Sequence, residues 1–164
     1  MLIAIGANLP DAAGAAPLAS CRAAVEALRS LPGLRVVAVS RWYTSPPDPP
    51  ADQPDYVNGV VRLAGKADPA WLLARLQAIE AQAGRQRGVT NAARPLDLDI
   101  VAMGALLRDA PDPVLPHPRA HLRGFVLLPL AEVAPDWVHP RLGRPVGALI
   151  DELRLAGELR LAGS

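Results

Sequence analysis

The sequence predicts an α+β fold, with an antiparallel sheet covered by helices on one face. Segments with strand and helix patterns follow one another in the order strand, helix, strand, strand, helix, strand, and two further helical segments come after them. The 164 residues are 51% hydrophobic and 20% charged, which is typical of a single globular domain spanning residues 1–164. Five of the 18 prolines fall between residues 45 and 54, which predicts a long stiff loop there.

The first half of the chain contains three strand patterns, one helix pattern and this loop. The first strand is a short apolar run that Gly6 closes, and Pro32-Gly33 ends the helix. The second strand is rich in valine and aromatic residues. In chain order we predict a strand at Leu2–Ile5, a helix at Pro17–Leu31, a strand at Leu34–Tyr43, a loop at Ser45–Pro54 and a strand at Tyr56–Leu63.

The second half begins with a clear helix start, because Asp68 can cap the helix and Pro69 suits its first position. We predict a helix from Asp68 that ends at Gly84, a polar loop at Gly84–Arg94, a strand at Leu96–Met103, irregular backbone at Asp112–Pro118, helices at Gly124–Ala134 and Pro145–Leu155, and a frayed tail. The element order matches the ferredoxin-like β-α-β-β-α-β arrangement, with additional C-terminal elements and long active-site loops. A ligand site between the sheet and these loops is the natural expectation.

Charge and cysteine content exclude several classes of protein. The 17 basic and 16 acidic residues give a net charge of +1, which is small for a protein that binds nucleic acid through its phosphates. The single cysteine excludes an intrachain disulfide framework. No apolar run reaches membrane-spanning length, and the N-terminal residues lack the pattern of a signal peptide. We therefore expect a cytoplasmic protein without nucleic-acid or membrane partners.

The strongest local feature is a pair of carboxylates in the strand that follows Arg94. Alternate side chains of a strand share a face, so Asp97 and Asp99 point the same way, with Cα atoms about 6.5–7 Å apart. Leu98 and Ile100 then point to the opposite face. Two carboxylates without cysteine or paired histidine suit Mg²⁺ better than zinc. The alternative is two solvated aspartates on an open strand face.

An arginine set accompanies these carboxylates. Arg85, Arg87 and Arg94 belong to one loop, and Arg119 and Arg123 to another. One guanidinium group can donate two parallel hydrogen bonds to a phosphate group. Arginines beside a carboxylate pair are therefore consistent with a Mg²⁺-bound polyphosphate. The chain has neither of the glycine-rich phosphate-binding motifs, so this would be a kinase site of another type. The alternative is a cluster of surface arginines that keeps the protein soluble.

Three further features favour a small-molecule site less strongly. Tyr56, Asn58 and Phe125 suit a flat heterocycle that forms hydrogen bonds, although a lone phenylalanine is often a core residue. His117, between two prolines, could contact phosphate or act as an acid, or it could be structural. Gln77 and Glu80 lie on one helical turn, where an exposed polar face is the alternative.

Taken together, these residues resemble the 6-hydroxymethyl-7,8-dihydropterin pyrophosphokinase family. The resemblance covers nearly the whole chain, and its R-x-x-D-x-D element is specific. It is carried by Ile5-Gly6-Ala7-Asn8-Leu9, Tyr43-Thr44-Ser45-Pro46-Pro47, Asp52-Gln53-Pro54-Asp55-Tyr56-Val57-Asn58, Gln77-Ala78-Ile79-Glu80, Gly84-Arg85-Gln86-Arg87, Arg94-Pro95-Leu96-Asp97-Leu98-Asp99, Pro116-His117-Pro118-Arg119, Arg123-Gly124-Phe125-Val126-Leu127 and Pro129-Leu130.

The resemblance implies a fold, a reaction and a role for each of these residues. It implies a ferredoxin-like core and transfer of pyrophosphate from ATP to the pterin hydroxymethyl group, with release of AMP, in folate biosynthesis. It implies a monomer that can associate with other folate-pathway enzymes. By resemblance, Asp97 and Asp99 hold two Mg²⁺ ions and Arg85 and Arg94 assist transfer. The pterin would contact Ser45, Pro47, Tyr56, Asn58 and Phe125, and ATP would contact Gln77, Glu80, Arg87, Ile100, His117 and Arg123.

Two alternatives stay open, and departures from the family pattern motivate the first of them. The loop between Arg85 and Arg94 lacks a tryptophan and is shorter than in well-known members, and Asp112 stands where many members place an arginine. One alternative is a non-catalytic homologue that binds pterin or nucleotide. The other is an RNA-binding ferredoxin-like domain, which the single phenylalanine and the charge of +1 disfavour.

Overall fold

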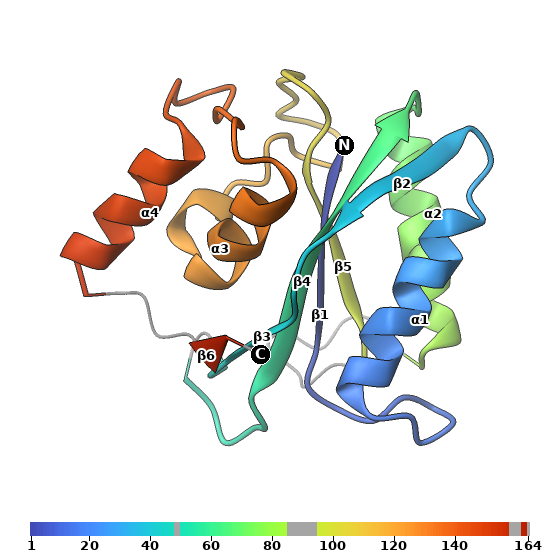
Figure 1. Ribbon diagram of the computed structural model, residues 1–164. Coiled ribbons are helices and arrows are strands. Elements are labelled where there is room, and N and C mark those ends of the chain that lie inside the picture. The colour runs from blue at the N-terminus through green and yellow to red at the C-terminus, as the bar shows by residue number, and fades with distance from the viewer. Residues whose placement is uncertain (48–49, 85–94, 158–161, 164) are drawn as a thin grey trace.

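An antiparallel sheet forms the middle layer of the structure, and helices pack on both of its faces (Figure 1). The computed structural model describes every residue except 48–49, 85–94, 158–161 and 164. Within the described residues, β4 pairs with β1, β2 and β3, while β5 lies at an edge of the sheet and pairs with β1. The strands are β1 (Leu2–Ala7), β2 (Leu34–Val39), β3 (Tyr43–Ser45), β4 (Tyr56–Gly65), β5 (Asp97–Ala102) and β6 (Ala162–Gly163).

Two helices, α1 (Pro17–Arg29) and α2 (Pro69–Gln82), cover one face of the sheet, as the sequence predicts (Figure 1). Asp68 caps α2, since its carboxylate accepts a hydrogen bond from the Trp71 N–H at 3.1 Å. The core on this face contains alternate residues of the strands, among them Ile3 and Ile5 of β1. Burial of these apolar side chains holds the two helices against the sheet.

Two C-terminal helices lie on the opposite side of the sheet, where the first packs against β4 and the second packs against the first (Figure 1). They are α3 (Gly124–Val133) and α4 (Val146–Leu155), and a short 3₁₀ helix at Ala120–Leu122, which the sequence did not predict, precedes α3. A second apolar core joins them to the sheet and includes Leu2, Val60 and Val101. These helices do not cover the whole of this face, and the pocket described below opens beside α3.

The predicted strand at Leu34–Tyr43 is wrong in one respect, because two strands occupy its place. Ser40 interrupts the ladder: its hydroxyl oxygen accepts a hydrogen bond from the Val60 N–H at 2.9 Å, which takes the place of a backbone carbonyl. The Trp42 ring then lies over Gly59, so close that a Cβ at Gly59 would come within 2.6 Å of it. These side-chain contacts separate β2 from β3.

The remaining expectations of secondary structure agree with the structure to within a few residues. The loop predicted at 84–94 lies outside the described residues, apart from Gly84 itself. The tail does not fray throughout, because β6 pairs with β3. Among the helices that the structure describes, none has the length and apolar character needed to cross a membrane.

Candidate active site

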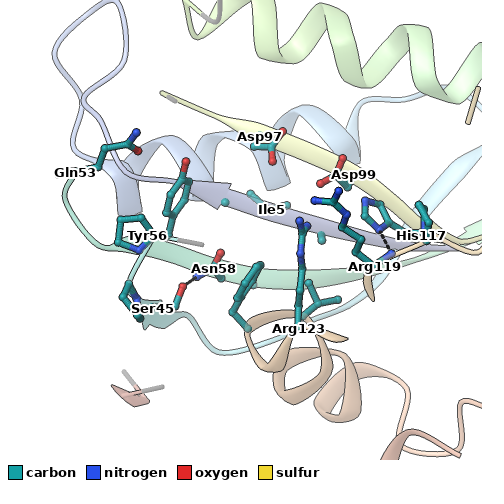
Figure 2. Close-up of a pocket in the computed structure, with 18 residues that line it drawn as sticks. Ile5, Ser45, Gln53, Tyr56, Asn58, Asp97, Asp99, His117, Arg119 and Arg123 are labelled. Atoms are coloured by element: carbon teal, nitrogen blue, oxygen red, sulfur yellow. Dashed lines mark hydrogen bonds between the residues drawn. The ribbon is translucent and has the colours of Figure 1, made fainter. Parts of the chain in front are cut away.

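A pocket of about 370 Å³ opens on the sheet face that also carries α3 (Figure 2). Its floor is formed by the middle of the sheet, and its walls come from the proline-rich loop, the segment at 117–119 and the start of α3. The lining residues are Ala4, Ile5, Gly6, Ser45, Pro46, Pro47, Gln53, Tyr56, Asn58, Gly59, Asp97, Asp99, His117, Pro118, Arg119, Arg123, Phe125 and Val126. Segments far apart in the sequence therefore meet at one cavity.

Two carboxylates of β5 face this pocket. Asp97 and Asp99 line it, whereas Leu98 and Ile100 are buried in the core on the opposite face, which confirms the predicted alternation. Their oxygen atoms are the kind of ligand that Mg²⁺ prefers. Within the described part of the chain, no group of three or more histidine, cysteine or acidic side chains could enclose a metal ion. A Mg²⁺ ion here would complete its coordination with water and substrate oxygens, as it commonly does in phosphoryl-transfer enzymes.

Across Gly6 of β1 from Asp97, the pocket carries a buried amide. Asn58 is 6% exposed, and its side-chain Nδ2 donates a hydrogen bond to the Ser45 hydroxyl oxygen at 2.7 Å. This bond directs the Asn58 Oδ1 toward Gly6, where an added Cβ would lie only 3.1 Å from it. The amide oxygen is thereby oriented to accept a hydrogen bond from a ligand. Tyr56 and Phe125 add aromatic surface to the same cavity.

His117 is fixed by two hydrogen bonds to backbone groups. Its backbone N–H donates to the Val101 carbonyl at 2.8 Å, and its ring Nδ1 accepts from the Arg119 backbone N–H at 3.1 Å. Burial, reinforced by Arg123 and Arg119 and opposed by Asp97, lowers the pKa of His117 to about 4. The ring is therefore neutral near pH 7, with its proton on Nε2. This state suits a hydrogen-bond donor to phosphate and does not suit a charged general acid.

Two arginines extend toward the strand that bears the carboxylates, as Figure 2 shows. Arg119 is exposed and Arg123 is half-buried, with the Arg123 guanidinium 5.5 Å from the centre of the Phe125 ring. No ion pair joins either guanidinium to a carboxylate of the described residues. Their charges are thus available to an anion in the pocket. Asp112 is exposed and is not among the residues that line the cavity.

The structure brings together nine of the predicted site residues and leaves three elsewhere. Ser45, Pro47, Tyr56, Asn58, Asp97, Asp99, His117, Arg123 and Phe125 line the pocket. Gln77, Glu80 and Ile100 do not. Glu80 does not lie on an exposed polar face of the helix but is buried. Its carboxylate accepts a hydrogen bond from the Leu98 N–H at 2.9 Å. Arg85, Arg87 and Arg94 lie outside the described residues.

Sequence reasoning gave no individual role to one polar side chain of the pocket, Gln53. Gln53 lines it, and the Asn8 side chain donates hydrogen bonds at 3.1 Å to the Gln53 Oε1 and to the Pro54 carbonyl. No feature of residue type singles out Gln53, since its place depends on how the loop folds back onto β1. Arg119 belongs to the arginine set that the sequence predicts for phosphate binding, and it does line the pocket.

The pocket therefore combines two chemically different sets of side chains. Carboxylates, guanidinium groups and a neutral imidazole donor are suited to a metal-bound polyphosphate. The amide and the aromatic side chains suit a flat polar heterocycle. The only cysteine of the chain is not a candidate nucleophile, since burial raises the pKa of the Cys21 thiol to about 12.

Comparison with known proteins points to one family. The sequence model of the family described as 7,8-dihydro-6-hydroxymethylpterin-pyrophosphokinase matches residues 2–135. The chain is 43% identical over 162 residues to the 2-amino-4-hydroxy-6-hydroxymethyldihydropteridine pyrophosphokinase of Pseudomonas aeruginosa, covering 99% of this chain and 96% of that protein. It is 39% identical over 138 residues to the enzyme of the same name from Haemophilus influenzae, covering 84% and 83%. It is also 32% identical over 162 residues to the folic acid synthesis protein fol1 of Schizosaccharomyces pombe, covering 99% of this chain and 21% of that longer protein.

Proposed function

The chain belongs to the 7,8-dihydro-6-hydroxymethylpterin-pyrophosphokinase family, and on that premise we propose that it transfers pyrophosphate from ATP to the hydroxymethyl oxygen of 6-hydroxymethyl-7,8-dihydropterin. Enzymes of this family are diphosphate-transferring kinases of folate synthesis. One observation carries the proposal. The same cavity holds a carboxylate pair, two guanidinium groups that form no ion pair with a described carboxylate, a fixed amide and aromatic surface.

The pterin would occupy the end of the pocket near Asn58. A pterin ring is flat and presents donors and acceptors along its edge, so it needs stacking surface and a fixed hydrogen-bonding partner. Tyr56 and Phe125 would supply the surface, and the Asn58 Oδ1, held in place by Ser45, would accept from a ring N–H. Pro47 would complete the contacts from the loop.

The triphosphate of ATP would occupy the other end. His117 would donate from Nε2 to a phosphate oxygen, since its Nδ1 is already bonded to the Arg119 N–H. Arg123 and Arg119 would offset the phosphate charge. Gln77, Glu80, Ile100 and Arg87 were expected at the nucleotide from the resemblance alone. For Glu80 the buried position favours an indirect role, which is developed below.

Asp97 and Asp99 would hold Mg²⁺, and two ions are expected. When bound, Mg²⁺ neutralises phosphate charge and favours ionisation of the substrate hydroxyl. The hydroxymethyl oxygen then attacks the β-phosphorus, the bond from that phosphorus to the oxygen bridging it to the α-phosphorus breaks, and AMP leaves. No side chain needs to form a covalent bond, because positioning and charge neutralisation account for most catalysis of phosphoryl transfer. Arg85 and Arg94 would assist transfer, and their roles stay predictions.

The proposal extends to the organisation of the protein. We propose one domain, residues 1–164, with a ferredoxin-like core formed by β1, α1, β2, β4, α2 and β5, acting as a cytoplasmic monomer that can associate with other enzymes of folate synthesis. The strand order β5-β1-β4-β2 supports this core. The start of α3 supplies one wall of the pocket, and α3 and α4 form the second apolar core together with the sheet.

The decisive assay measures AMP release from ATP with and without 6-hydroxymethyl-7,8-dihydropterin, in Mg²⁺ and then in EDTA. We expect AMP only when pterin and Mg²⁺ are both present. A folded protein that binds pterin but releases no AMP would favour the non-catalytic alternative. Release of ADP in place of AMP would mean attack at the γ-phosphorus and would refute the mechanism.

A further inference from the structure

The strand that carries the two carboxylates lies at an edge of the sheet. Within the described residues, β5 pairs only with β1, and α2 packs beside it (Figure 1). In an antiparallel pair, successive residues point their N–H groups alternately toward the partner strand and away from it. Leu98, between Asp97 and Asp99, points its N–H away from β1, toward α2. Among the described strands none lies on that side to accept this N–H, and a buried N–H without a partner costs free energy.

Glu80 supplies the missing acceptor. Its position follows Leu72 and Leu76 at intervals of four residues, so all three side chains lie on the face of α2 that packs against the sheet. Glu80 is only 2% exposed, and its Oε2 lies 2.9 Å from the Leu98 nitrogen. A carboxylate at a core position is unfavourable unless hydrogen bonds compensate for its lost hydration. The hydrogen bond from the Leu98 N–H supplies part of this compensation for the Glu80 carboxylate.

We propose that Glu80 is a positioning residue for the carboxylate pair. By accepting the Leu98 N–H it takes the place of a neighbouring strand, and it fixes the backbone at the one residue that separates Asp97 from Asp99. The spacing and direction of the two carboxylates at the pocket then depend on this bond. The inference rests on the proposed function in that Asp97 and Asp99 hold the divalent ion. It assigns Glu80 an indirect role in place of the nucleotide contact that the family resemblance implies.

The first test uses metal-free protein and needs no catalysis. Amide hydrogen exchange at Leu98, followed by NMR in EDTA, should be at least tenfold faster in Glu80→Ala than in the wild type. Glu80→Gln should keep the wild-type rate within about threefold, because its side-chain oxygen can still accept the bond. Leu76→Ala is the matched control, since Leu76 is fully buried one turn earlier on the same helix but makes no bond to β5 through a polar side chain. Exchange at Leu98 that is unchanged in Glu80→Ala would overturn the proposal.

The second test measures the divalent ion. Mn²⁺ binding, measured by electron paramagnetic resonance with a non-hydrolysable ATP analogue, should weaken at least tenfold in Glu80→Ala and stay within threefold in Glu80→Gln and Leu76→Ala. Equal weakening in Leu76→Ala would show general loosening of α2 and would overturn the proposal. Equal weakening in Glu80→Gln would assign the effect to charge and would overturn it too. If Glu80→Ala does not fold, Glu80→Leu takes its place under the same criterion, because leucine has a similar volume but no hydrogen-bond acceptor.

The two tests separate failure of this inference from failure of the proposed function. A wild-type protein that binds no Mn²⁺ with the nucleotide analogue would refute the metal assignment of Asp97 and Asp99, and with it the positioning role. A wild-type protein that binds Mn²⁺, with Glu80→Ala behaving identically, would refute the inference alone.

Discussion

Replacing His117 by asparagine should remove a large part of the acid sensitivity of the folded protein. Burial, together with Arg123 and Arg119 and against the opposing effect of Asp97, lowers the pKa of His117 from 6.5 to about 4. In the unfolded chain the pKa returns to about 6.5. Below pH 6.5 the unfolded chain therefore binds more protons than the folded protein, and the free energy of unfolding falls as the pH decreases toward 4.

The size of this effect follows from the two pKa values. With about 6.5 in the unfolded chain and about 4 in the folded protein, the contribution of His117 to the free energy of unfolding falls by about 2 kcal/mol between pH 7.5 and pH 5. This value is an upper bound, because the ring is partly exposed and solvent screens its interactions. Asparagine does not titrate in this range, so the variant loses this component of the pH dependence.

The assay is urea unfolding followed by tryptophan fluorescence, in EDTA, at pH 7.5 and pH 5. Asparagine is the suitable replacement because its side-chain oxygen can accept the Arg119 N–H in place of Nδ1. Burial also lowers the pKa of His139, and this contribution is common to both proteins and cancels in their difference. Equal losses in wild type and variant, or an NMR titration of His117 with a midpoint near 6.5, would refute the reasoning.

Three further predictions concern the pocket. Asp97→Ala and Asp99→Ala should each abolish AMP release without changing the circular dichroism spectrum, because both carboxylates face the pocket and the core loses nothing; near-normal turnover in either would contradict the metal assignment. Arg119→Ala should raise the KM for ATP about tenfold or more and leave the KM for pterin unchanged, since a hydrogen bond to a charged group contributes about 1.5–3 kcal/mol; equal changes in both constants would argue against phosphate binding. Gly59→Ala should lower the free energy of unfolding by about 1–3 kcal/mol, because the new methyl group would come within 2.6 Å of the Trp42 ring; an unchanged urea midpoint would mean that the ring moves aside freely.

The sequence by itself determined the features that depend on local periodicity. Alternation along a strand places Asp97 and Asp99 on one face, whatever that face packs against. The helix that begins after Asp68 is equally local, because capping involves residues within one turn. The proline-rich loop was also predictable, since proline removes the backbone donors that regular structure requires. These features give the element order and the centre of the candidate site.

Contacts between distant segments decided the rest. Glu80 and Gln77 are similar polar residues on one helix, and only the docking of α2 against β5 buries Glu80 and gives it the Leu98 N–H. The break between β2 and β3 depends on side-chain contacts with β4, which no short sequence window contains. The neutral state of His117 depends on burial and on its neighbours in the folded protein. Burial, hydrogen bonding and pKa depend on what lies nearby in space, and for these residues only the tertiary structure decides that.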